Sequence, residues 1–194
     1  MAAVETARLY LRRLQPSDLE AYYQRIYADP EVMRTLPPRG PITREAFAAR
    51  VPAVMLGHWD THGFGPWVVI HKADREFIGH CGLRYWPDSS DVEVFYALDK
   101  RYWGQGLATE GARASLRYGF EQVRLERIMA AAMVDNYASR RVLEKIGMRY
   151  EHDFRFGELT VAGYAILRAD YHPDHAPYCY IPSDTQESPD VHCP

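Results

Sequence analysis

The distribution of apolar residues along the chain predicts a β-sheet interrupted by helices. Residues 92–98 read Val-Glu-Val-Phe-Tyr-Ala-Leu, and this density of β-branched and aromatic residues is typical of a buried strand. Other short runs with a strand-like composition precede and follow it. The predicted strands are residues 8–14, expected at an edge of the sheet, and residues 67–71, 76–86, 92–98, 127–134, 148–156 and 159–167.

Helical periodicity appears between these strands. Ala108, Ala112, Leu116 and Phe120 recur at helical spacing, so the segment after the central strand is expected to pack on the sheet as a helix. Another helix is expected to contain Pro52, which should kink or divide it. The predicted helices cover residues 17–29, 43–59, 107–120 and 136–146.

Length and composition place the chain among globular proteins with one sizeable core. It has 194 residues, of which 47% are hydrophobic and 25% charged. A net charge of −3 without a lysine or arginine block predicts no nucleic-acid partner. No apolar run is long enough to span a membrane, and the N-terminus lacks the pattern of a secretory signal. Cys81, Cys179 and Cys193 are few and irregularly spaced, which favours the reducing cytoplasm over a disulfide framework.

A glycine turn joins the central strand to the helix that follows it. Its sequence, Arg-Tyr-Trp-Gly-Gln-Gly-Leu-Ala at residues 101–108, has the spacing R-x-x-G-x-G. The first amides of a helix lack internal partners and carry the positive end of the dipole, and glycines let a pyrophosphate approach them. The spacing matches neither the Walker pattern nor the dinucleotide fingerprint. The turn therefore predicts an anion site of another kind.

A second well-specified stretch spans residues 135–148. Asn136 is a suitable N-cap, Ala138, Val142, Leu143 and Ile146 form an inward stripe, and Gly147 is placed to end the helix.

Both stretches resemble motifs of the GNAT acyltransferase superfamily, namely Q/R-x-x-G-x-G/A and N-x-A-S-x-x-V-L-E-K-x-G-M. The opening Glu-Thr-Ala-Arg-Leu-Tyr-Leu-Arg at residues 5–12 also resembles the ribosomal-protein N-terminal acetyltransferase-like branch of that superfamily. The resemblance covers roughly residues 5–170. It implies a single α/β (α+β) domain over residues 1–170, with a mixed, mostly antiparallel sheet of about six to seven strands and about four helices on both faces. Two parallel central strands would splay apart, and residues 171–194 are expected to form an extended or disordered tail.

The resemblance also implies a binding site for acetyl-CoA, the acetyl donor. Pyrophosphate would lie on the turn amides, mainly those of Gly104 and Gly106, and the pantetheine arm would pair with the central strand like an added strand. Arg141 or Lys145 could reach the adenosine phosphates, with surface solvation as the alternative. The implied cofactor-binding residues are Val94, Phe95, Tyr96, Ala97, Arg101, Tyr102, Trp103, Gly104, Gln105, Gly106, Leu107, Ala108, Asn136 and Ser139.

Acetyl transfer to an amine needs a neutral amine, close approach to the carbonyl, a donor for the oxyanion and a proton for the leaving thiolate. No serine or cysteine elbow is present, so direct attack is expected. Glu93 is the predicted catalytic base, because it lies on the strand before the turn and burial would raise its pKa. Asp135, Glu158 and His80 are alternatives, and a purely structural carboxylate at position 93 is a further one.

The proton donor departs from the usual pattern of the family. Many GNAT enzymes use a tyrosine on the helix after the asparagine, where this chain has Val142-Leu143-Glu144. Ser139 matches the serine that the ribosomal-protein branch is thought to use, and it is the second predicted catalytic residue. A local cap for Ser139, or a water as donor, stays open. For the oxyanion, a backbone amide near Tyr96 is expected.

These observations predict an N-acetyltransferase acting on a protein N-terminal amine or a small-molecule amine, with a non-catalytic acyl-CoA-binding regulator as the alternative. Subunits of such folds often pair through the closing hairpin and tail, so a homodimer is also an expectation. No metal is predicted, because the spacing of histidine and cysteine in the tail matches no standard zinc pattern. These tail residues are His172, His175, Cys179, His192 and Cys193.

Overall fold

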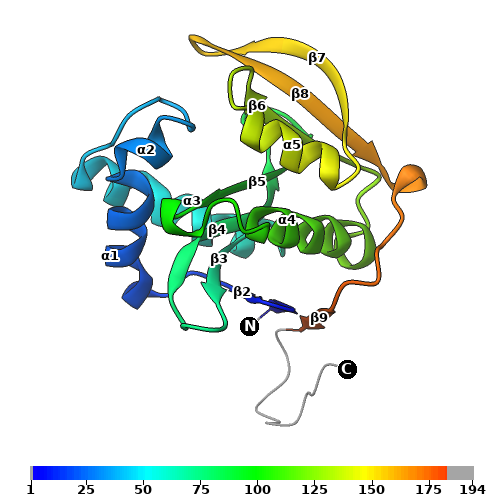
Figure 1. Ribbon diagram of the computed structural model, residues 1–194, viewed down its shortest axis with the longest axis horizontal. Helices are drawn as coiled ribbons and strands as arrows, with labels where there is room; N and C mark the ends of the chain where they lie inside the picture. The colour runs from blue at the N-terminus through cyan, green and yellow to red at the C-terminus, as the bar shows by residue number, and fades with distance from the viewer. Residues whose placement is uncertain (1, 183–194) are drawn as a thin grey trace.

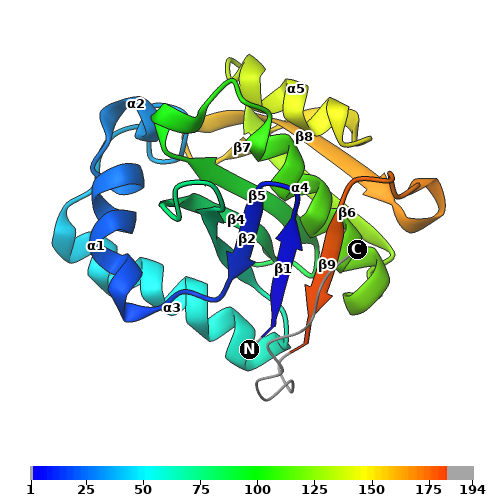
Figure 2. The same ribbon diagram turned by 60° about the horizontal axis from the view of Figure 1, so that its bottom comes forward.

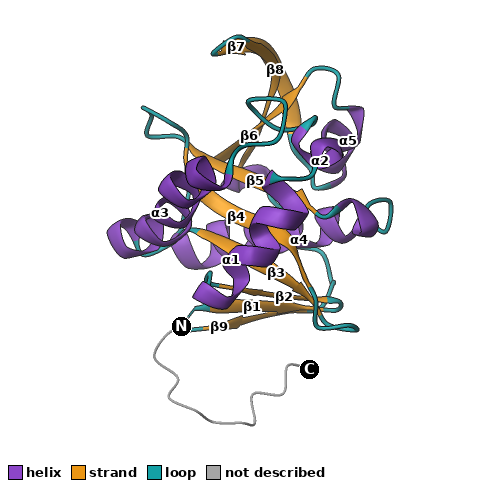
Figure 3. Cartoon of the chain, turned by 90° about the vertical axis from the view of Figure 1, so that its left-hand side faces the viewer, coloured by secondary structure: helices purple, strands orange, loops and turns teal. Residues whose placement is uncertain are grey.

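The computed structural model describes residues 2–182, and they form one mixed sheet with helices on both faces (Figure 1). The described sheet has nine strands in the order β7-β8-β6-β5-β4-β3-β2-β1-β9, which Figure 3 shows stacked from top to bottom. Only β5 and β6 are parallel neighbours among these strands. The strands are β1 (Ala3–Thr6), β2 (Leu9–Arg12), β3 (Pro66–His71), β4 (Phe77–Tyr85), β5 (Val92–Leu98), β6 (Arg127–Met133), β7 (Arg149–Phe156), β8 (Leu159–Leu167) and β9 (Tyr178–Ile181).

The helices divide between the two faces of the sheet. One face packs on the N-terminal helices through a buried cluster that includes Tyr22, Ile26 and Phe47, and the other face packs on α4 and α5. The α-helices are α1 (Leu19–Tyr22), α2 (Pro30–Met33), α3 (Arg44–His62), α4 (Leu107–Tyr118) and α5 (Tyr137–Lys145). Short 3₁₀ or π turns are η1 (Pro16–Asp18), η2 (Tyr23–Tyr27), η3 (Lys100–Tyr102), η4 (Gly119–Val123) and η5 (Arg168–Asp170).

A division of the helix at Pro52 is not observed, because α3 runs continuously through that residue. Thr43 Oγ1 caps the helix by accepting the Ala46 amide at 3.2 Å. A proline inside a helix costs about 3 kcal/mol, but α3 buries one apolar side chain per turn on either side of it. This burial keeps the helix whole.

The hydrophobic pattern does not predict strands β1 and β9. The prediction that residues 8–14 lie at an edge of the sheet is wrong. Residues 8–14 contain β2, which lies inside the sheet because β1 covers it and β9 covers β1 (Figure 2). Both missed strands are four residues long, too short for alternation to be visible. The segment predicted as a tail from residue 171 thus contributes the edge strand, which pairs with the N-terminus.

Cysteine chemistry also departs from expectation. Cys81 is a free, buried thiol, but Cys179 on β9 is disulfide-bonded. Within residues 2–182 no cluster of potential metal ligands is found, and no helix there is long and apolar enough to cross a membrane. His192 and Cys193 lie outside the described residues.

The central strands β5 and β6 splay apart, as the fold prediction requires. Their ladder consists of one pair, Glu93 opposite Met129. Beyond Glu93, the β5 edge that faces β6 therefore carries backbone groups without a ladder partner. This opening leads to the glycine turn that follows β5.

Candidate active site

The glycine turn leaves the N-terminus of α4 open. Gly104 and Gly106 adopt positive φ angles of 75° and 78°, a conformation that glycine adopts without steric cost. Gly106 is the N-cap, and no side chain of residues 2–182 accepts from the first amides of α4. A Cβ built on Gly104 would meet no atom within 4 Å. The turn therefore presents unpaired N–H donors to approaching anions.

The side chains of the turn hold its backbone in place. Tyr102 donates its hydroxyl proton to Asp74 at 2.7 Å, and Trp103 Nε1 donates to the Leu98 carbonyl at 2.7 Å. Arg101, one of the predicted cofactor-binding residues, pairs with the buried Asp99 at 2.6 Å. The parts of the turn that remain available to a ligand are thus mainly backbone groups.

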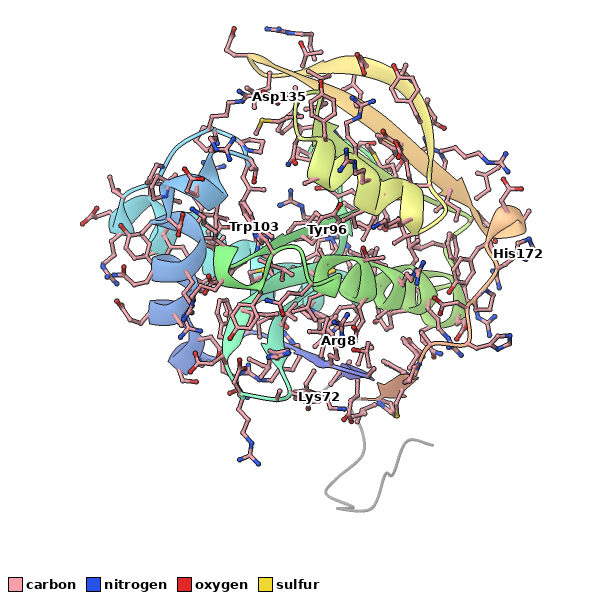
Figure 4. All side chains as sticks on the ribbon, in the orientation of Figure 1. Arg8, Lys72, Tyr96, Trp103, Asp135 and His172 are labelled. Carbon is pink, nitrogen blue, oxygen red and sulfur yellow. The ribbon has the colours of Figure 1, made fainter. Side chains whose placement is uncertain are left out.

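Glu110 anchors the turn to the β1–β2 connection. Its carboxylate accepts from Thr6 Oγ1 at 2.6 Å, from the Arg8 amide at 2.8 Å and from Arg8 Nε at 2.7 Å. Burial acts to raise the pKa of Glu110, but the Thr6 and Arg8 hydrogen bonds lower that pKa overall. Arg8 Nη1 also donates to the Gln105 carbonyl at 2.9 Å, from below α4 in Figure 4. A structural role for Glu110 near the helix N-terminus follows.

Tyr96 and Ser139 meet across the splay. The Tyr96 hydroxyl lies 2.9 Å from Ser139 Oγ and 3.1 Å from the Ser139 carbonyl oxygen, in the region between α4 and α5 (Figure 4). Burial raises the pKa of Tyr96, which keeps its proton at neutral pH. Asn136 caps α5 by accepting the Ser139 amide at 3.1 Å. The sequence predicts a role only for the backbone near Tyr96, whereas the structure also brings the Tyr96 hydroxyl to Ser139.

Glu93 lies at the vertex of the splay, on the opposite face of β5 from Tyr96. Its side chain is only 4% exposed, and Arg84 Nε donates to its Oε1 at 2.6 Å. Burial raises the pKa of Glu93, and the Arg84 charge opposes this without reversing it. A carboxyl with a raised pKa at a strand opening is a stronger proton acceptor than an ordinary exposed carboxylate.

The other candidate bases are placed less favourably. Asp135 is exposed, and the hydrogen bond from Arg39 lowers its pKa, which makes it a weaker base. Glu158 lies in the exposed β7–β8 turn. His80 is buried between Tyr22 and Phe95, and burial lowers its pKa to about 3.

A cavity of about 370 Å³ lies beside the turn. Its walls come from the β1–β2 connection, α4, the end of α5 and residues 171–178. Gly106, Arg113 and Lys145 all line it. The Lys145 ammonium has no hydrogen-bond or ion-pair partner among the described residues, whereas Arg113 pairs with Asp174 at 3.1 Å. Arg141 does not line this cavity.

Comparison with known proteins places this architecture in a family. A model of the GNAT acetyltransferase domain matches residues 8–149. The chain is 32% identical over 166 residues to the uncharacterized protein YkkB of Bacillus subtilis, covering 82% of this chain and 92% of the relative. It is 31% identical over 159 residues to FsC-acetyl coenzyme A-N(2)-transacetylase of Aspergillus fumigatus, covering 78% and 66% respectively.

Solved structures agree with this assignment. A GNAT acetyltransferase from Bacillus anthracis superposes with a TM-score of 0.73 at 30% identity, covering 86% of this chain and 99% of that one. RimJ of Mycobacterium smegmatis, solved with CoA-disulfide, has the same fold, with a TM-score of 0.70 at 22% identity and coverages of 85% and 87%. With the matched model spanning most of the chain, the protein belongs to the GNAT family of acetyltransferases.

Proposed function

We propose that this protein is an acetyl-CoA-dependent N-acetyltransferase that acts on a primary amine by direct attack in a ternary complex. The observation that carries the proposal is the N-terminus of α4, which no side chain caps and which follows β5 at the open end of the splay. Such a terminus binds phosphate through unpaired amides and the helix dipole. The acceptor would be a protein N-terminal α-amine or a small-molecule amine.

In this proposal, acetyl-CoA follows the edge of β5. Pyrophosphate binds the amides of the turn, mainly at Gly104 and Gly106. The pantetheine arm pairs with the backbone of Val94 to Ala97, which is supported by the absence of a β6 ladder partner beyond Glu93. The cavity beside Gly106 receives the phosphorylated adenosine, with the ammonium of Lys145 as an available cation.

Residues near the splay then meet each chemical requirement of the transfer. Glu93 takes the proton from the attacking amine, since its raised pKa and its place at the vertex suit a general base. A backbone amide near Tyr96 donates to the developing oxyanion. Tyr96 and Ser139 supply a proton to the leaving thiolate, and the strand tyrosine takes the place of the helix tyrosine that this chain lacks.

The proposal is tested with the purified chain, acetyl-CoA and a panel of amines. The panel includes peptides with free N-termini, amino acids, polyamines and aminoglycosides, and both free CoA and acetylated product are measured. Amine-dependent release of CoA is the expected result. Binding of acetyl-CoA without release for any amine would favour the acyl-CoA-binding regulator, and absence of binding would overturn both readings.

Removing the hydroxyls of Tyr96 and Ser139 is expected to slow acetyl transfer without weakening acetyl-CoA binding. The double variant Tyr96→Phe/Ser139→Ala should lose about a hundredfold in kcat, the lower end of what positioned proton transfer contributes. Each single variant should lose less, because the other hydroxyl remains. The measurement is kcat for the variants, together with acetyl-CoA affinity by calorimetry.

Tyr164→Phe is the matched control for this experiment. Tyr164 is a buried tyrosine whose hydroxyl donates to Glu144 at 3.3 Å and accepts from Arg140 at 3.1 Å, so it also contacts α5. Removing the Tyr164 hydroxyl tests whether the loss of any buried hydroxyl that contacts α5 lowers kcat. A similar decrease in kcat for Tyr164→Phe, or unchanged kcat in the double variant, would contradict the assignment.

A further inference from the structure

The guanidinium of Arg84 lies beside the predicted base Glu93, and its Nη atoms make no hydrogen bond within residues 2–182. Arg84 on β4 and Glu93 on β5 are direct cross-strand partners. The guanidinium lies 4.2 Å from the centre of the Phe95 ring, and its Nε binds Glu93 Oε1 at 2.6 Å. The Arg84 side chain is 31% exposed, whereas that of Glu93 is 4% exposed. The Arg84 guanidinium is therefore more accessible than the carboxylate with which it pairs.

The Nη edge of this guanidinium has no acceptor among residues 2–182. The only hydrogen bond of the Arg84 side chain there runs through Nε to Glu93. A guanidinium carries donors in a rigid planar fork, and its paired N–H groups match the two oxygens of a carboxylate. One edge is thus occupied by the base, and the neighbouring edge is available for a second carboxylate.

The surroundings of Arg84 contain little uncompensated negative charge. Burial lowers the pKa of His58 and of His80, and the Arg84 charge lowers both further, so these two imidazoles add no negative charge. Asp135, the carboxylate in the connection between β6 and α5, is already paired with Arg39 at 2.7 Å. In the described structure, Glu93 and Asp135 are each already paired with an arginine, which disfavours a polycation such as a polyamine or an aminoglycoside.

We propose that the acceptor is a small α-amino acid, whose carboxylate binds the Nη edge of Arg84. This inference rests on the proposed function. The Nε and Nη edges of one guanidinium adjoin each other, so a carboxylate on the second edge lies close to Glu93. The amine of an α-amino acid is attached one carbon from its carboxylate, which places it within reach of the base. The N-terminal residue of a peptide has an amide in place of this carboxylate and does not satisfy the site.

Acetyl transfer from acetyl-CoA to an α-amino acid needs no further reactant. The neutral α-amine forms the new C–N bond to the acetyl carbon, and the C–S bond of the thioester breaks. Glu93 accepts the amine proton, and the leaving thiolate receives one from the Tyr96 and Ser139 side. The products are an N-acetylamino acid and CoA.

The test compares each amino acid with its own carboxamide, since both carry the same α-amine and side chain. Values of kcat/KM are measured over a pH series, because the two amines lose their protons at different pH. Wild-type protein is expected to prefer the acid about 10- to 100-fold, the value of a charged hydrogen-bonded pair. Arg84→Gln should abolish this preference, and Arg84→Lys should retain part of it as a point charge.

Arg44→Gln is the matched control. Arg44 also pairs with a carboxylate, Glu20, and lies 4.4 Å from the centre of an aromatic ring, that of Tyr23, but on the outer surface of the N-terminal helices. Its substitution should leave the acid-to-amide ratio unchanged. Acetyl-CoA affinity should be the same in all variants.

Two failures can be told apart. If wild-type protein acetylates carboxamides, peptides or polyamines as well as amino acids, and Arg84→Gln leaves the ratio unchanged, the inference about the acceptor is wrong while the acetyltransferase proposal stands. If no amine releases CoA, the proposed function is wrong and this inference fails with it. If Arg84→Gln does not fold, the ratio of kcat/KM for acid and carboxamide in wild-type protein, together with Arg84→Lys, tests the inference about the acceptor.

Discussion

Gly104→Glu is expected to abolish measurable acetyl-CoA binding and, with it, acetyl transfer. The substitution places a carboxylate in the open space over the uncapped N-terminus of α4, where the pyrophosphate would lie. Like charges in contact cost several kcal/mol, so a loss of affinity of at least about a hundredfold follows. The new side chain would also compete for the same amides. Calorimetry with acetyl-CoA measures the effect directly.

Backbone strain must be separated from charge in this experiment. Gly104 has a φ of 75°, and a residue with a Cβ there costs about 1–2 kcal/mol. Gly63, the C-cap of α3, has a φ of 73° and equally open space for a Cβ. Gly63→Glu should therefore lower the melting temperature as much as Gly104→Glu but leave binding intact. Equal loss of binding in both variants, or retention in both, would remove the turn from the proposed site.

The local sequence was sufficient to predict those elements whose structure depends on a single segment. The glycine turn and the two helices α4 and α5 depend on neighbouring residues, namely a cap, an apolar stripe and a glycine, and each lies where its pattern predicts. The splay follows from the resemblance to the family, and the single β5–β6 pair agrees with it. These elements position most of the candidate site.

Pairings between distant segments were not readable from the sequence. Strand β9 exists because its four residues find the edge of β1, which lies more than 170 positions away. The contact of Tyr96 with Ser139 needs the side-chain direction on β5 and the position of α5 together. The Arg84–Glu93 pair needs the register of two antiparallel strands, which a one-residue slip would destroy. These three contacts join segments that are separate in the sequence, and the hydrophobic periodicity of one segment does not predict its tertiary contacts.

Glu93→Gln is expected to lower kcat by about 10²- to 10⁴-fold, the range attributed to general base catalysis. Glutamine has nearly the same shape, and its amide oxygen can still accept from Arg84 Nε, so the buried contact and the fold should survive. What is lost is the ability to hold a proton. Acetyl-CoA affinity should change little, because Glu93 lies on the opposite face of β5 from Tyr96, whose hydroxyl contacts Ser139 of α5.

The pH dependence of kcat/KM distinguishes a base from a structural carboxylate. A base works in its ionised form, and burial raises the pKa of Glu93 above the ordinary carboxyl value of 4.5. Activity should therefore rise with pH through an acid limb displaced above that value, and the limb should be absent from the residual activity of Glu93→Gln. Asp135→Asn provides the comparison, since the pKa of Asp135 is lowered and its loss should leave the limb in place. A limb that persists in Glu93→Gln and disappears in Asp135→Asn would transfer the role to Asp135, and Glu93 would then serve to hold Arg84 in the sheet.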